Sequence, residues 1–176
     1  MDETSYAIAL GSNRRHGRHG APQAVVAAAL VTLAQAGLHI VAASPVIHTA
    51  AHGPAGRSFA NAAAIVASPL DPQALLRLLK KIEHDFGRRP GRRWGQRILD
   101  LDIALWSGGA WPPAHAMSAP GRLSVPHRAL AARTFVLAPL AAIAPEWRDP
   151  RSGRTVRQLL ALLIRSRPVD RTRRRQ

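Results

Sequence analysis

Two aspartates, Asp100 and Asp102, stand one residue apart in an apolar segment of the chain. In an extended strand alternate side chains share a face, so both carboxylates should project from the same side. The aliphatic residues around them are expected on the opposite face: Leu99, Leu101, Ile103 and Leu105. Two carboxylates this close repel each other and are costly to desolvate unless a cation lies between them. Because Mg²⁺ is typically held by one or two carboxylates together with substrate phosphates, the pair predicts a phosphate-handling magnesium site.

Many unrelated proteins contain a bare Asp-x-Asp on an exposed sheet face, where both carboxylates are solvated and idle. An arginine-rich loop directly upstream disfavours that interpretation. Its basic residues are Arg88, Arg89, Arg92, Arg93 and Arg97. Guanidinium groups fork onto phosphate oxygens and neutralise the charge that develops during phosphoryl transfer. A solvated or RNA-binding loop could have the same composition, but proximity to the aspartates favours a triphosphate.

The usual phosphate-binding loops are absent from the sequence. No G-x-x-x-x-G-K-[ST] motif occurs, and the glycine near the N-terminus lacks the spacing of a dinucleotide-binding loop. A bound nucleotide would therefore be held by side chains and metal.

Phe59 and Asn61 share one face of another predicted strand. An aromatic ring and an amide placed together can stack on a flat heterocycle and hydrogen-bond to it. Core packing beside a strand-end amide is the alternative, and the two residues alone favour it. His127 is a further candidate for lining a cleft. None of the eight histidines has the spacing of zinc ligands.

The elements that must position these residues follow from hydrophobic patterning. Strands are predicted over residues 6–10, 39–47, 58–67 and about 97–106, and helices over 22–36 and 72–86. Pro45 indicates an edge strand or a bulge in the second strand. The order β-α-β-β-α-β predicts the α+β class with a ferredoxin-like core. Additional short C-terminal helices are expected near residues 126–133, 135–143 and 156–164.

Length and composition limit the class of protein. The 176 residues are 47% apolar, which suits a single domain, expected over residues 1–166, and a basic tail over 167–176. The chain has no cysteine, so thiolate metal sites are excluded. It shows neither a secretory signal nor a run of about 20 apolar residues, so a cytoplasmic location is expected. The net charge of +15 predicts a polyanionic partner, such as a nucleotide, a nucleic acid or a membrane surface.

With these residues assembled, the sequence resembles the 6-hydroxymethyl-7,8-dihydropterin pyrophosphokinase family over residues 7 to about 162. The most specific match, at residues 93–103, is RWGQRILDLDI, similar to the family's R-W-G-P-R-x-L-D-L-D-[IL] with Gln96 in place of proline. Supporting matches lie at residues 9–13, 59–63, 82–83, 122–127 and 133–140. The resemblance implies a ferredoxin-like fold and transfer of pyrophosphate from ATP to the hydroxymethyl group of a reduced pterin, with release of AMP.

The resemblance also implies roles for individual residues. Asp100 and Asp102 would hold two Mg²⁺ ions that bridge the triphosphate, with Arg88 and Arg97 as catalytic arginines. The positions implied to contact ATP are Glu83, Arg88, Trp94, Arg97, Ile103, His127 and Arg133. The positions implied to contact the pterin are Thr49, Ala51, His52, Phe59, Asn61, Asp100 and Phe135, with the two phenylalanines sandwiching the ring. The implied partners are small molecules, without nucleic acid or membrane, and the implied state is a monomer.

The chain departs from the family pattern at two loops. The family often has Thr-Pro-Pro-[LWY]-Gly, whereas residues 49–53 read TAAHG and lack the proline stiffness. The arginine-rich loop is one residue shorter, so Arg89 and Arg92 are both candidates for its second functional arginine. Strict alternation also places Arg97 opposite Asp100, so the strand must begin after Arg97 or bend there.

Two other classes compete with the enzyme. An RNA-binding module fits the charge and the element order, but the aromatic-rich strand of such modules is missing and paired aspartates repel phosphate. A catalytically dead, regulatory relative fits the altered loop, but the intact Asp100, Asp102 and Arg97 argue against it.

Overall fold

A computed structural model of the chain describes residues 3–49, 58–87, 98–113 and 122–166. Five strands form one antiparallel sheet: β1 (Thr4–Ser12), β2 (His39–Ala43), β3 (Ile47–Thr49), β4 (Phe59–Ser68) and β5 (Asp100–Trp106). They are ordered β2-β4-β1-β5, and β3 also pairs with β4. The predicted ferredoxin-like α+β class is confirmed, with β2 and β3 together in the place of one second strand.

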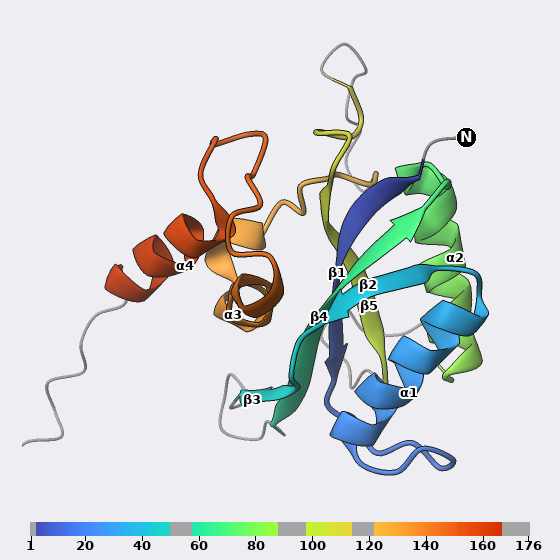
Figure 1. Cartoon of the computed structure of the whole chain (residues 1–176). Coiled ribbons are helices and arrows are strands. Elements are labelled where there is room, and N and C mark those ends of the chain that lie inside the picture. The colour runs from blue at the N-terminus through green and yellow to red at the C-terminus, as the bar shows by residue number, and fades with distance from the viewer. Residues whose placement is uncertain (1–2, 50–57, 88–97, 114–121, 167–176) are drawn as a thin grey trace, which may run out of the picture.

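Helices cover the two faces of this sheet (Figure 1). The helices α1 (Pro22–Gln35) and α2 (Pro72–Asp85) lie on one face, and α3 (Thr134–Ile143) and α4 (Val156–Arg165) lie on the other. The start of α2 is as predicted, because the Asp71 carboxylate accepts a hydrogen bond from the N–H of Ala74 (2.7 Å) and Pro72 takes the first helical position.

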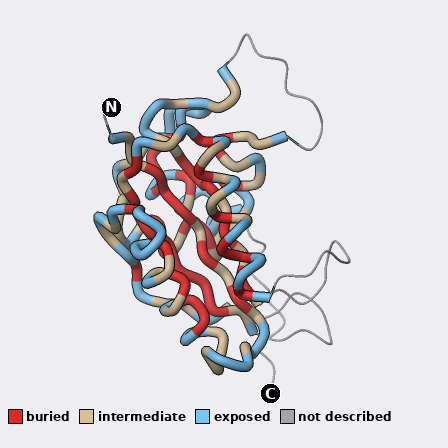
Figure 2. The backbone as a smooth tube through the Cα atoms, turned by 90° about the vertical axis from the view of Figure 1, so that its right-hand side faces the viewer, coloured by how far each residue is buried: buried red, intermediate tan, exposed pale blue. Residues whose placement is uncertain are grey.

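Each face of the sheet has its own hydrophobic cluster, and the strands between them are the most buried part of the tube in Figure 2. The cluster under α1 and α2 contains larger aliphatic side chains, among them Ile8, Leu10, Leu101 and Ile103. The strand residues of the cluster under α3 and α4 are mostly small, among them Ala7, Ala63 and Ala104. We call these the α1/α2 face and the α3/α4 face.

The predicted second strand, residues 39–47, is broken in two. Pro45 has no N–H to give to a ladder, and the pairing stops around it. Ser44 closes the gap instead: its N–H donates to the carbonyl of Ala63 (2.8 Å), and its hydroxyl accepts from the N–H of Ala63 (2.9 Å). Of the two alternatives predicted from Pro45, the edge strand is confirmed, since β2 lies at the end of the strand order. The register of β2 with β4 also shifts, but between Ile40 and Ala42, upstream of the proline.

The last strand ends at Trp106 as predicted but differs from its prediction at its start and in the direction of one side chain. It begins at Asp100 and not near residue 97, which confirms that the strand starts after Arg97. Its register with β1 shifts so that Ile8 pairs with Ile103 but Ala7 pairs with Leu105. The extra residue at this bulge turns Leu105 to the α3/α4 face, so its predicted place beside Leu101 is wrong.

The C-terminal third is largely as predicted. The helices α3 and α4 are present, but the helix expected over residues 126–133 is only a 3₁₀ turn, η1 (Leu130–Ala132). The tail, residues 167–176, lies outside the described residues. In the part of the chain that the structure describes, no helix has both the length and the apolar character needed to cross a membrane.

Candidate active site

Both aspartates project from the α3/α4 face of the sheet. Residues directly opposite one another in an antiparallel pair share a face. Asp102 pairs with Ala9, which packs in the α3/α4 cluster, while Leu101 belongs to the cluster on the opposite face. The prediction that Asp100 and Asp102 share one face is therefore confirmed.

One cross-strand row joins a residue predicted to bind metal to a residue predicted to contact the pterin. Asp100 pairs with Gly11 on β1, and Gly11 pairs with Asn61 on β4. A Cβ at Gly11 would lie 3.3 Å from Oδ1 of Asn61, so the glycine leaves free the space between the amide and the carboxylate. Asn61 is 4% exposed, and its Nδ2 donates to Oγ1 of Thr49 at 2.8 Å. The amide is thereby oriented with its oxygen towards the Gly11 gap.

The two phenylalanines predicted to hold the pterin come from different elements on this face. Phe59 is two residues before Asn61 on β4 and pairs with Thr49. Phe135 lies in α3, which packs against β4, and its ring has the Arg133 guanidinium carbon 5.7 Å from its centroid. Both phenylalanines are half-buried. Their sandwich around a ligand stays a prediction.

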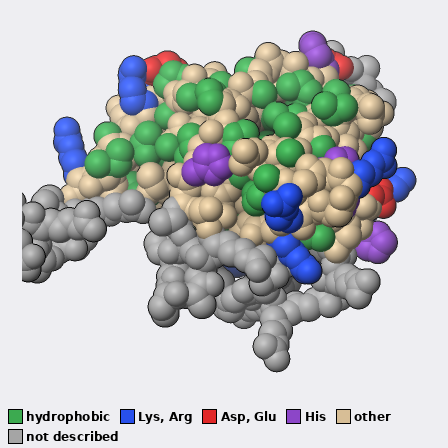
Figure 3. All heavy atoms as spheres, turned by 90° about the horizontal axis from the view of Figure 1, so that it is seen from below, with side chains coloured by type: hydrophobic (Ala, Val, Ile, Leu, Met, Phe, Trp, Pro, Cys, Tyr) green, Lys and Arg blue, Asp and Glu red, His purple; other side chains and the backbone are tan. Residues whose placement is uncertain are grey.

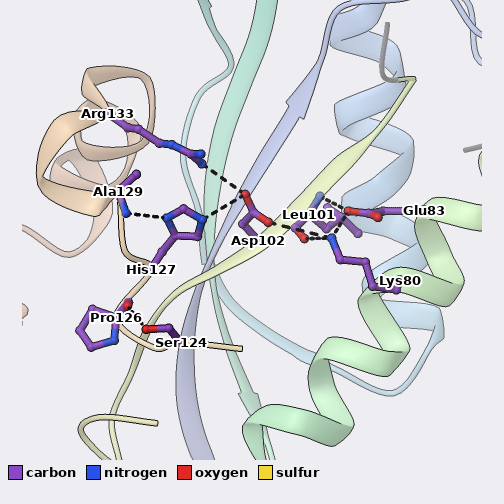
Figure 4. Close-up of polar contacts among 9 residues, drawn as sticks. All are labelled: Lys80, Glu83, Leu101, Asp102, Ser124, Pro126, His127, Ala129 and Arg133. Carbon is purple, nitrogen blue, oxygen red and sulfur yellow. Dashed lines mark hydrogen bonds and ion pairs between the residues drawn. The ribbon is translucent and has the colours of Figure 1, made fainter. Parts of the chain in front are cut away.

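The Asp102 carboxylate has a basic group beside each oxygen (Figure 4). Its Oδ2 lies 3.4 Å from Nη1 of Arg133 and 3.8 Å from Nε2 of His127, and its Oδ1 lies 4.0 Å from Nζ of Lys80. The carboxylate itself is 28% exposed. The helix α2 and the segment that leads into α3, which are far apart in the sequence, thus converge on one acidic side chain that solvent can still reach.

His127 is placed by the bulge in β5. Its N–H donates to the carbonyl of Ala104 (3.0 Å), and its Nδ1 accepts from the N–H of Ala129 (3.1 Å). Burial lowers the pKa of His127 from its ordinary 6.5, although the Asp102 carboxylate acts in the opposite direction. Because Nδ1 accepts a hydrogen bond, the neutral ring carries its proton on Nε2, which faces Asp102.

Glu83 lies beside β5 from the α2 side. Its side chain has no exposed surface, and its Oε1 accepts hydrogen bonds from the N–H of Leu101 and from Nζ of Lys80, both at 2.7 Å. The resemblance implied that Glu83 contacts ATP, and Lys80 is not among the residues predicted from the sequence. Their spacing of three residues on a helix, which brings two side chains together, is the signal that could have found the pair.

The remaining predicted residues are placed as follows. The side chain of Ile103 is 2% exposed in the core of the α1/α2 face, so only its backbone is available to a nucleotide. The others lie outside the described residues: Ala51, His52, Arg88, Arg89, Arg92, Trp94 and Arg97.

The donor set fits magnesium. Within the described ranges, no group of three or more His, Asp or Glu side chains could enclose a metal ion. Mg²⁺ does not need one, because it commonly takes one or two carboxylates from the protein and its other oxygen ligands from phosphates and water. Two hard carboxylates on one face, in a chain without cysteine, suit this cation better than a soft metal.

Comparison with known proteins agrees with this geometry. The family model for 7,8-dihydro-6-hydroxymethylpterin-pyrophosphokinase (HPPK) matches residues 7–145. Proteins named 2-amino-4-hydroxy-6-hydroxymethyldihydropteridine pyrophosphokinase are similar over most of the chain. The one from Methylorubrum extorquens is 37% identical over 89% of this chain and 91% of its own length. The one from Pseudomonas aeruginosa is 39% identical over 88% of each.

Other matches cover only part of the longer protein. A Synechocystis protein of the same name is 38% identical over 71% of this chain, and the match spans 60% of that protein. Among solved structures, an HPPK-DHPS of Plasmodium falciparum has a TM-score of 0.63 at 14% identity, covering 93% of this chain and 43% of that chain. A second HPPK-DHPS, in complex with substrates, has a TM-score of 0.67 at 13% identity, covering 94% and 44%. At these identities the solved structures support the fold alone.

Proposed function

The chain belongs to the 7,8-dihydro-6-hydroxymethylpterin-pyrophosphokinase family, and we propose that Asp100 and Asp102 are its metal-binding catalytic centre. It transfers pyrophosphate from ATP to the hydroxymethyl group of 6-hydroxymethyl-7,8-dihydropterin and releases AMP. One observation supports this assignment most directly. The Asp102 carboxylate lies among three basic side chains, and Asp100 projects from the same face of the sheet.

The reaction needs positioning and charge neutralisation more than covalent help from the protein. The pterin hydroxymethyl oxygen bonds to the β-phosphorus of ATP, the bond from that phosphorus to the AMP oxygen breaks, and the hydroxyl proton is lost. Mg²⁺, of which two ions are proposed, would neutralise phosphate charge and orient the triphosphate when bound to the two aspartates. No covalent nucleophile is required.

The chain's own residues act around that centre. Arg133 brings a permanent positive charge to the side of Asp102 that faces α3. His127, kept neutral by burial, presents a donating Nε2–H at the same side. Both can stabilise negative charge on phosphate oxygens near Asp102. Arg88 and Arg97 are proposed as additional phosphate ligands, by resemblance alone.

The pterin is proposed to lie across the row that joins Asn61 to Asp100. The Asn61 oxygen can accept a hydrogen bond from a ring N–H, and Gly11 leaves room for the ring edge. Phe59 and Phe135 supply aromatic surface from β4 and α3. Ala51 and His52, which lie outside the described residues, are proposed as pterin contacts by resemblance alone.

Among the described residues, the face drawn in Figure 3 shows no feature that favours the competing RNA-binding function. On the face drawn in Figure 3, the Lys and Arg side chains of the described residues stand at several separate places, with hydrophobic side chains between them. A protein that binds a nucleic acid backbone normally gathers such charges in a patch or stripe.

The deciding experiment supplies ATP, Mg²⁺ and 6-hydroxymethyl-7,8-dihydropterin to the purified chain and follows the release of AMP. We expect AMP in proportion to protein, dependence on the pterin, and loss of turnover when EDTA removes the metal. Absence of AMP together with tight, steeply salt-dependent binding of an RNA oligonucleotide would instead establish the RNA-binding alternative.

A further inference from the structure

The free edge of β5 is held by α2 at the point where the two aspartates lie. Among the described strands β5 pairs only with β1, so it is an edge strand. Edge strands leave alternate N–H and C=O groups without a strand partner. At Leu101 both groups are taken by side chains of α2. Glu83 accepts from the N–H at 2.7 Å, and Lys80 donates to the carbonyl at 3.1 Å.

These two hydrogen bonds hold the peptide groups on both sides of Leu101. The N–H of Leu101 belongs to the peptide that joins it to Asp100, and its carbonyl belongs to the peptide that joins it to Asp102. A peptide group is planar, so fixing one of its polar atoms restricts the orientation of the whole plane. The directions in which the Asp100 and Asp102 side chains leave the strand are thereby constrained from outside the sheet.

Lys80 contacts Glu83, the Leu101 carbonyl and Asp102 at the same time. Its Nζ lies 2.7 Å from the carboxylate of Glu83, which has no exposed surface and needs a cation beside it. The same ammonium lies 4.0 Å from Oδ1 of Asp102. Figure 4 shows it on the opposite side of that carboxylate from Arg133 and His127. Asp102 is therefore bracketed between α2 and the segment that leads into α3.

We propose that Lys80 is a positioning residue for the Asp100–Asp102 pair. Its ammonium keeps Glu83 and the Leu101 carbonyl together, so that both carboxylates occupy their working positions before metal and ATP arrive. This inference rests on the roles proposed above for Asp100 and Asp102. Rate losses on the order of 100-fold follow from misplacements of about 1 Å, which makes such a support consequential.

Lys80→Met tests the proposal, because it keeps an apolar side chain of similar length and removes the ammonium. The neighbouring residue offers a matched control, since Lys81 is exposed on the same helix and Lys81→Met removes the same charge from the protein. We expect Lys80→Met to lower kcat by roughly 10- to 100-fold, with KM for the pterin within about two-fold of the wild type. Lys81→Met should change neither constant.

A second measurement is independent of turnover. Amide hydrogen exchange of Leu101 and Asp102, followed by NMR on the metal-free protein, should be faster in Lys80→Met and unchanged in Lys81→Met. Lys80→Gln can still donate a hydrogen bond to Leu101 or Glu83, so both effects should be smaller in it. If Lys80→Met does not fold, the same two measurements are made on Lys80→Gln.

Unchanged kcat in the Lys80 variants would overturn the proposal. So would a fall in kcat without faster exchange at Leu101 and Asp102, because the lysine would then act on substrate directly. Should the wild type release no AMP, the proposed function fails, whereas the exchange measurement still decides whether Lys80 holds the segment. Unchanged exchange would reject the positioning role in that case too.

Discussion

The two faces of the sheet differ in what their strand residues do. On the α1/α2 face, large aliphatic side chains such as Ile8, Leu10 and Leu101 fill the space beneath two helices. On the α3/α4 face, the same strands present alanines, a glycine, an amide and two carboxylates. Small residues leave room over the sheet, and polar ones line that room. Both faces have a hydrophobic core, but only the α3/α4 face also carries the polar residues of the proposed site.

The division is incomplete at the edge of the sheet. Lys80 and Glu83 belong to α2, yet their hydrogen bonds reach the strand that carries both aspartates. A helix on the stabilising side can thus influence the catalytic side without crossing the sheet, because β5 exposes its backbone there. Substitutions on the two faces should separate these contributions.

The largest effect is expected from the carboxylates themselves. Asp100→Ala and Asp102→Ala should each reduce kcat/KM by about 10³-fold or more, equivalent to about 4 kcal/mol of transition-state stabilisation. Both variants should remain folded, since these side chains do not fill the core. Asp85→Ala removes an exposed carboxylate from α2 and is the control. Full turnover in either active-site variant would refute the assignment, and AMP release with circular dichroism provides both readouts.

A variant in the core of the α1/α2 face should have the opposite effect, losing stability but keeping its activity. Leu33 is fully buried in α1, so Leu33→Ala should lower the free energy of unfolding by about 2–5 kcal/mol. Its kcat should stay at the wild-type value at temperatures where the variant is folded. Urea denaturation measures the first quantity and AMP release the second. A large loss of kcat in the folded variant would show that the two faces are not separable.

A smaller effect is expected at the gap between the metal and pterin positions. The Cβ of Gly11→Ala would meet Oδ1 of Asn61 at 3.3 Å and occupy space proposed for the pterin. We expect KM for the pterin to rise about ten-fold, equivalent to about 1.4 kcal/mol, with KM for ATP unchanged. Gly17→Ala, where nothing lies within 4 Å of the added Cβ, is the matched control. Equal behaviour of the two variants would place the pterin elsewhere.

The smallest effect is expected on the pH dependence of stability, through His19 beside Phe86. His19 stacks on Phe86 with ring centroids 5.0 Å apart, and desolvation, followed by the charges of His16 and Arg18, lowers the pKa of His19 from 6.5. The unfolded chain then binds the proton more readily, so this contribution to stability is present above about pH 6.5 and is lost as the pH falls below it.

His19→Phe keeps the ring stack without a titrating group. The difference in urea midpoint between about pH 7.5 and pH 5.5 should therefore be smaller in the variant than in the wild type. An identical difference in both proteins would exclude His19 as a contributor. Turnover is not expected to respond to this substitution, which would again distinguish the two faces.

Much of the secondary structure, and the placement of the two aspartates on one face of the sheet, could be predicted from local sequence patterns. Alternation over residues 100–103 correctly predicted that the two aspartates share a face, because side-chain direction in a regular strand has a period of two. It failed at Leu105, since a bulge is a property of the pairing with β1 and not of the strand alone. The helix predicted over residues 126–133 is also wrong in extent, since only the 3₁₀ turn η1 (Leu130–Ala132) forms there.

The sequence by itself determined the kind of site: the Asp-x-Asp pair, its arginine-rich neighbour and the motifs shared with the family all reside in the order of residues. Only the tertiary structure decided which groups surround Asp102. Lys80 comes from α2, whereas His127 and Arg133 come from the segment that leads into α3, and contacts between residues far apart in the chain depend on how helices and strands pack. The same holds for Lys80 as a support of β5, because that role exists only where a helix lies beside an unpaired strand edge.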